Sequence, residues 1–191
     1  MLGLGSSITT GGAIIAPSIK ATFTSDFTSD VDGWLAFSIQ NSSSDLTLAA
    51  NTNPYDDLGG SAPNSDGWLR GTYGVTQTNI NGVHRNGWIT GYTKERGDYV
   101  VLSLKLYIVN DSGKWGGSDD VEVLITTPPS NPNSSQDVPL DTETTLNYTS
   151  NPDADGVYAQ TSIQVLTQTA GDLPQVGAVF YIKDVVVQVW N

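Results

Sequence analysis

The sequence lacks cysteine, has a single histidine, His84, and contains few basic residues. Without thiols there can be no disulfide bridges, thiolate zinc sites or cysteine nucleophiles, and one imidazole excludes metal sites built from several histidines. Lysine and arginine number 8 against 20 aspartates and glutamates, which gives a net charge of −12. Such a chain is repelled by phosphate backbones. We therefore expect no nucleic-acid partner.

Long hydrophobic runs are also missing. The most apolar stretch, residues 180–190, is much shorter than the roughly 20 residues that span a bilayer. A secretory signal needs a basic region followed by an apolar core of about 7–15 residues. Here the first basic residue is Lys20, and glycine and hydroxyl residues interrupt the apolar positions before it. We expect no membrane partner and no export by the usual secretory route.

The residues that are abundant favour turns and short strands. The chain has 20 glycines and 9 prolines, and only 15% of its residues are charged. Its length of 191 residues suits one domain. No helix is expected, and residues 51–67 and 128–139 are expected to be long connections. Strand patterns predict the segments 19–27, 34–40, 45–50, 68–75, 87–93, 99–109, 120–126, 144–148, 158–166 and 179–190.

Apolar and polar residues alternate most clearly in the segments 99–109 and 179–189. This period of two is typical of antiparallel sheets with one face in a core. The pattern predicts an all-β fold, an antiparallel sandwich over residues 21–191. The expected core members are Trp34, Phe37, Leu102, Leu104, Leu106, Phe180 and Ile182.

Two segments carry a family resemblance. The pattern Phe23…Asp26-Phe27…Asp32-Gly33-Trp34 and the strand at residues 177–187 resemble the first and last strands of jelly-roll carbohydrate-binding modules. The resemblance implies an antiparallel jelly-roll β-sandwich.

The same resemblance implies a structural calcium site. Such modules hold Ca²⁺ between the loop near the first strand and an acidic residue of the last, which implies Asp26, Asp30 or Asp32 together with Asp184. Carboxylate oxygens suit calcium. The chain departs from the family pattern at Lys183, where an acid is expected. The alternative interpretation is that these aspartates stabilise their own turns.

Glycan binding and catalysis can be weighed from the aromatic and acidic residues. Sugar-binding modules stack exposed rings on pyranose faces, but strand aromatics also fill cores. Trp115, which lies in a glycine-rich turn, is expected to be an exposed ring that contacts glycan or protein, and Trp88 is a second candidate.

The sequence gives little support for catalysis. The carboxylate pairs at 119–120 and 153–155 lie in turn-forming stretches, and no nucleophile motif or phosphate loop is present. We expect a non-enzyme; a free-standing glycosidase is the third alternative.

Residues 1–20 form an arm rich in glycine, serine and threonine, with no charged side chain before Lys20. Such a segment cannot fold alone. We expect it to be an extended docking arm, ahead of a sandwich at 21–191. Its apolar anchors are Leu2, Leu4, Ile8, Ile14 and Ile15.

The first 16 residues resemble the N-termini of virion proteins of tailed bacteriophages. This resemblance implies a capsid decoration (cement) or appendage protein of the virion, assembled in the host cytoplasm. Its partners would be the major capsid protein or other virion subunits, and it would form a homo-oligomer, most simply a trimer. The alternative function is a non-catalytic, calcium-stabilised carbohydrate-binding module of a glycoside hydrolase, with a glycan as partner. No cofactor other than structural Ca²⁺ is expected.

Overall fold

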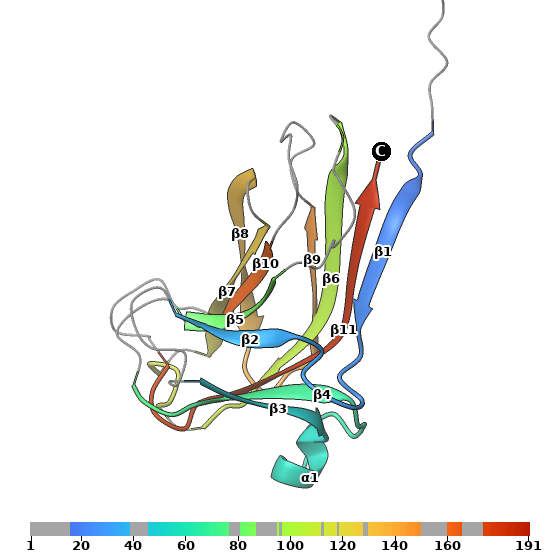
Figure 1. Ribbon diagram of the computed structural model, residues 1–191. Helices are drawn as coiled ribbons and strands as arrows, with labels where there is room; N and C mark the ends of the chain where they lie inside the picture. Colours follow the sequence, from blue (N-terminus) through green and yellow to red (C-terminus); the bar gives the residue numbers. More distant parts are fainter. Residues whose placement is uncertain are drawn as a thin grey trace, which may run out of the picture.

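The chain folds into two antiparallel sheets that enclose a core (Figure 1). The computed structural model describes residues 16–38, 46–76, 81–86, 95, 97–111, 113–117, 119–127, 130–149, 160–165 and 174–191. Within these ranges there are eleven strands and one short helix. The predicted all-β fold is confirmed. No helix in the described ranges is long and apolar enough to cross a bilayer.

Sheet A is organised around its last strand. It contains β1 (Ile19–Ser25), β3 (Leu46–Thr52), β4 (Trp68–Tyr73), β6 (Tyr99–Ile108), β9 (Thr144–Thr149) and β11 (Val179–Trp190), in the order β3-β4-β11-β6-β9. β6 pairs with β11 on one side. On the other side β4 pairs with residues 179–182 and β1 with residues 185–190, so these two short strands follow one another along β11.

Sheet B is the second layer. It contains β2 (Trp34–Ser38), β5 (Asn81–Asn86), β7 (Asp120–Thr127), β8 (Ser130–Pro139) and β10 (Gln160–Val165), in the order β2-β5-β10-β7-β8. β5 lies just before the predicted strand 87–93, which is outside the described residues.

The core between the sheets follows the alternation in the sequence. The side chains of Trp34, Leu102, Leu104, Leu106, Phe180 and Ile182 are each at most 1% exposed, as predicted. The side chain of Phe37, the remaining predicted core residue, lies outside the described part. The Trp34 Nε1 donates a hydrogen bond to the Ser25 Oγ at 3.2 Å, which satisfies its one polar atom inside the core.

The alternation in β11 is interrupted by a bulge. Asp184 has φ 51°, and the pairing register with β6 shifts between Lys183 and Val186. Before the bulge the even-numbered residues Phe180 and Ile182 face the core. After the extra residue the odd-numbered Val185, Val187 and Val189 do so, and all five are buried. Without the bulge the three valines would face outward.

Two expected connections contain regular structure instead. Within residues 51–67, α1 (Pro54–Leu58) begins at Asn53, whose Oδ1 accepts a hydrogen bond from the Tyr55 N–H at 3.0 Å. Proline fits the first turn of this helix because that N–H has no helical partner. Within residues 128–139, β8 pairs with β7 at the edge of sheet B, where the missing N–H of proline is tolerated. The expectations of no helix and of an unpaired 128–139 connection were therefore wrong.

The N-terminal part of the sandwich is fastened to its C-terminus. The Ser18 N–H donates to the Asn191 Oδ1 at 2.7 Å, and the Asn191 N–H donates to the Ser18 carbonyl at 3.2 Å. The predicted anchors Leu2, Leu4, Ile8, Ile14 and Ile15 lie outside the described residues. The docking arm stays a prediction.

Candidate functional site

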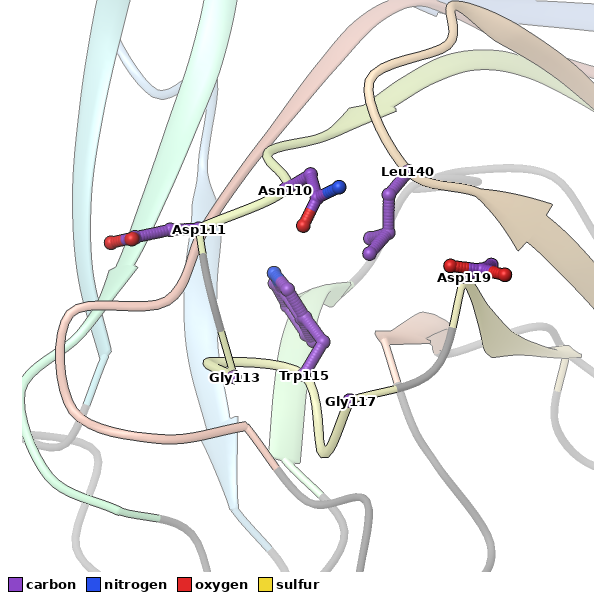
Figure 2. Close-up of a pocket in the computed structure, with 7 residues that line it drawn as sticks. All are labelled: Asn110, Asp111, Gly113, Trp115, Gly117, Asp119 and Leu140. Carbon is purple, nitrogen blue, oxygen red and sulfur yellow. The ribbon is translucent and has the colours of Figure 1, made fainter.

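A depression lies at the end of the sandwich where β6 leads into β7 (Figure 2). Its volume is about 190 Å³. It is lined by Asn110, Asp111, Gly113, Trp115, Gly117, Asp119 and Leu140.

A glycine-rich turn shapes this depression. Gly113, Gly116 and Gly117 all have φ between 74° and 84°, which glycine adopts at no steric cost. The Lys114 N–H donates to the Asp111 carbonyl at 2.8 Å, which closes the turn. The chain therefore doubles back over the end of the core.

Trp115 is drawn into the core by this turn. It is 1% exposed, its Nε1 donates to the Val109 carbonyl at 2.9 Å, and its ring meets Tyr73 edge to face at 6.0 Å. The expectation that Trp115 is an exposed ring was wrong, because the turn folds it inward instead of presenting it to solvent. Trp88, the second expected glycan contact, lies outside the described residues.

Polar side chains surround the buried ring. Figure 2 shows Asn110 and Leu140 directed toward Trp115, Asp119 at one rim and Asp111 turned outward. The Leu140 N–H donates to the Asp119 carbonyl at 3.1 Å, which joins the two walls. The side chains of Asn110, Asp111 and Asp119 form no hydrogen bond or ion pair with any residue that the structure describes. No described residue occupies the side-chain donors and acceptors of Asn110 and Asp119, which border the depression.

A second depression adjoins the first at Asn110. Its volume is about 270 Å³, and it lies between residues 58–62 and the end of β6. The Asp141 Oδ1 accepts hydrogen bonds from the Tyr107 hydroxyl at 3.2 Å and from the Asn110 N–H at 2.9 Å. Burial, reinforced by the Asp141 carboxylate, raises the pKa of Tyr107 to about 12. Tyr107 therefore stays protonated and keeps donating to Asp141 at neutral pH.

The segment that walls this second depression is anchored on the outer face of sheet A. Ala62 packs there in a small cluster with Trp68, Tyr107, Val109 and Tyr181. The Tyr181 hydroxyl donates to the Asp57 Oδ2 at 2.7 Å, which ties α1 to β11. The wall formed by residues 58–62 is thus held by both apolar and polar contacts.

The aspartates predicted to bind calcium make turn contacts near the first strand. The Asp26 Oδ1 accepts hydrogen bonds from the Thr28 N–H at 3.0 Å and from the Thr28 hydroxyl at 2.9 Å, and these bonds lower the pKa of Asp26. The Asp30 Oδ1 accepts from the Asp32 N–H at 2.6 Å. Both contacts span two residues, as the alternative interpretation of turn-stabilising aspartates expects.

Asp184 is engaged elsewhere. Its Oδ2 lies 3.0 Å from the Lys105 Nζ on β6. Lys183, at the position where the family pattern has an acid, donates through its Nζ to the Ser65 Oγ at 3.0 Å. Asp26, Asp30 and Asp32 border one depression of about 310 Å³, but the described residues contain no group of three or more acidic or histidine side chains placed to hold a metal ion. Calcium binding stays a prediction.

Sequence reasoning missed Asn110, Asp141 and the wall at residues 58–62. Only their position in the sequence could have pointed to Asn110 and Asp111. They directly follow the most regular strand, and loops at strand ends often carry binding residues. The wall comes from a segment 50 residues earlier in the chain, and nothing in its local sequence reveals where it packs.

No family model and no curated protein matches the chain. Solved structures do match. The first is the carbohydrate-binding and catalytic module pair of Clostridium thermocellum endo-1,4-β-D-xylanase 10B, solved with xylohexaose (TM-score 0.52, 13% identity, 87% of this chain and 28% of that one). The C-terminal family 22 carbohydrate-binding module of the same xylanase gives 0.50 and 12% identity over 87% of this chain and 92% of that one. An exo-β-agarase gives 0.54 and 12% identity over 88% of this chain and 25% of that one.

These likenesses establish the fold. The chain is an antiparallel jelly-roll β-sandwich of the type found in carbohydrate-binding modules, as predicted. It spans only about a quarter of the length of the xylanase module pair and of the agarase. The comparisons give the virion hypothesis no support.

Proposed function

We propose that the protein is a non-catalytic carbohydrate-binding module that takes a glycan into the two depressions around Asn110. The observation that carries the proposal is a pair of polar side chains, Asn110 and Asp119, at the rim of a depression on this fold, with no hydrogen-bond or ion-pair partner among the described residues. Fold alone does not give function, so the proposal depends on this site.

The chemistry of the site matches that of sugar hydroxyls. A hydroxyl both donates and accepts, the Asn110 amide does the same, and the carboxylate of Asp119 accepts. Hydrogen bonds to charged groups contribute about 1.5–3 kcal/mol each, more than neutral ones. With a net charge of −12, the protein favours uncharged glycans over acidic ones.

The same residues do not suit glycoside hydrolysis. A glycosidase needs a general acid whose pKa is raised, usually by burial in an apolar pocket. Asp111 and Asp119 are exposed side chains at the rim of an open depression. A binding role therefore fits them better than a catalytic one.

Affinity electrophoresis tests this function. Native gels would contain xylan, agarose or mixed-linkage β-glucan as neutral polysaccharides, and alginate or polygalacturonate as acidic ones. We expect at least one neutral polysaccharide to retard the protein. Asn110→Ala should weaken the retardation, whereas Asn147→Ala, on an exposed position of β9, should not. Unchanged migration in every neutral gel, or equal retardation of Asn110→Ala and the unmodified protein, would contradict the proposal.

A further inference from the structure

The aromatic rings at this site are not available for stacking on a sugar. Trp115 is 1% exposed with its indole N–H committed to Val109, and Tyr107 in the adjoining depression is 3% exposed with its hydroxyl committed to Asp141. Stacking on a pyranose requires a ring face in contact with solvent. Recognition at this site must therefore come from hydrogen bonds to the edge of a sugar ring.

The first depression is small. Its volume of about 190 Å³ is below the roughly 300–1,000 Å³ of sites that enclose drug-sized molecules. The turn at residues 113–117 and Leu140 border it, and Trp115 is buried beneath it. This space suits one sugar residue better than a chain of several.

Asn110 marks the direction in which a longer ligand continues. It is the residue that lines both depressions. A sugar seated in the first depression would carry its glycosidic linkage across Asn110, with the next residue between the 58–62 wall and Asp141. A chain bound in this way ends in the first depression.

Charge restricts which sugar can occupy that position. Asp111 and Asp119 line the first depression, and Asp141 lies beyond Asn110. The Nζ of the nearby Lys114 donates to the Val176 carbonyl at 2.8 Å. A uronate would place a like charge among carboxylates, which is unfavourable.

We propose, on the basis of the function proposed above, that the depression of Figure 2 binds the terminal, uncharged sugar residue of a glycan chain by its edge, where the Asn110 amide donates and accepts hydrogen bonds and the Asp119 carboxylate accepts them. The ligand class is the chain ends of neutral polysaccharides and oligosaccharides. The interior of a long chain is not the ligand.

Chain-end counting tests this mode. A neutral insoluble polysaccharide that retains the protein, such as xylan or agarose, is divided, and one half is partly cleaved so that its chain ends increase at constant mass. Binding capacity, measured by depletion of protein from solution, should rise in proportion to the number of ends. Equal or reduced capacity would overturn end binding while leaving glycan binding intact. Failure to bind any neutral polysaccharide before or after cleavage would overturn the proposed function itself.

A pair of charge variants tests the selectivity. Asp119→Asn keeps the shape of the rim but removes one charge, and Asp137→Asn makes the same change on an exposed position of β8. Asp119→Asn should increase affinity for a uronate-terminated oligosaccharide several-fold, and Asp137→Asn should leave it unchanged. The charge argument would be overturned if the two variants had equal effects. It would also be overturned if the unmodified protein bound a uronate-terminated oligosaccharide as tightly as a neutral one.

Discussion

Gly71 on β4 supports the core by leaving space for an aromatic ring. It lies opposite Phe180 in the pairing of β4 with β11, and Phe180 is fully buried. A Cβ at position 71 would meet the Phe180 Cε2 at 2.8 Å and approach Cζ and Cε1 more closely still. Because Phe180 also packs against Tyr73 with ring centroids 6.0 Å apart, the ring has little room to move away.

Gly71→Ala should therefore destabilise the sandwich. Overpacking a core costs about 1–3 kcal/mol. The reduced freedom of the unfolded chain offsets about 0.4–1 kcal/mol of this. We expect a net loss of about 1–2 kcal/mol in the free energy of unfolding, and a Tm lower by about 2–8 °C for a chain of this size.

Urea unfolding followed by tryptophan fluorescence measures this loss, and a double-mutant cycle assigns its cause. In the background of Phe180→Leu, whose side chain is smaller, the alanine should cost close to nothing, so the two changes should couple by about 1 kcal/mol or more. If Gly71→Ala is neutral, or equally destabilising with either residue at 180, the steric explanation is refuted.

Three further predictions concern titration and the N-terminal arm. Carbon-13 NMR should place the Asp26 pKa below that of an ordinary aspartate, and Thr28→Val should raise it partway by removing the hydroxyl. Because the folded-state pKa is the lower one, Asp26 stabilises the fold above the unfolded-state pKa, and this contribution is lost as the pH falls through the folded-state value. Tyr107 has a raised pKa of about 12, so its stabilising contribution is present below about pH 10 and lost as the pH rises through 12. Ultraviolet difference titration of the unmodified protein and Tyr107→Phe should reveal one tyrosine with this late midpoint, and an ordinary midpoint would contradict its burial. Deleting residues 2–16 should leave the Tm unchanged, because the contacts of Ser18 with Asn191 remain; a drop of more than a few degrees would mean that the arm stabilises the sandwich.

The sequence predicts the layers of the fold better than it predicts the site. Alternation in β6 and β11 is a local property, so the core positions between residues 99 and 109 could be identified directly. β8 was missed because prolines argue against a strand unless it lies at an edge, and edge position is a property of the whole sheet.

The exposure of Trp115 was predicted wrongly, and the contacts of Asp184 could not be predicted, for related reasons. A tryptophan between glycines is compatible with an exposed turn or with a turn that folds inward, and the core space beside Tyr73 decides between them for Trp115. Asp184 lies at a bulge that fixes its position relative to β6, where Lys105 is its partner. Both outcomes depend on residues distant in the sequence.

The location of the glycan is the central claim, and amide chemical shifts test it most directly. The nitrogen-15-labelled full-length protein would be titrated with a neutral oligosaccharide derived from the polysaccharide that retards it in gels. The largest changes should fall on the amides of Asn110, Asp111, Gly113 and Gly117 and on the Trp115 indole N–H. Changes concentrated along a sheet face, such as residues 145–149 of β9, with these five signals unmoved, would contradict the account.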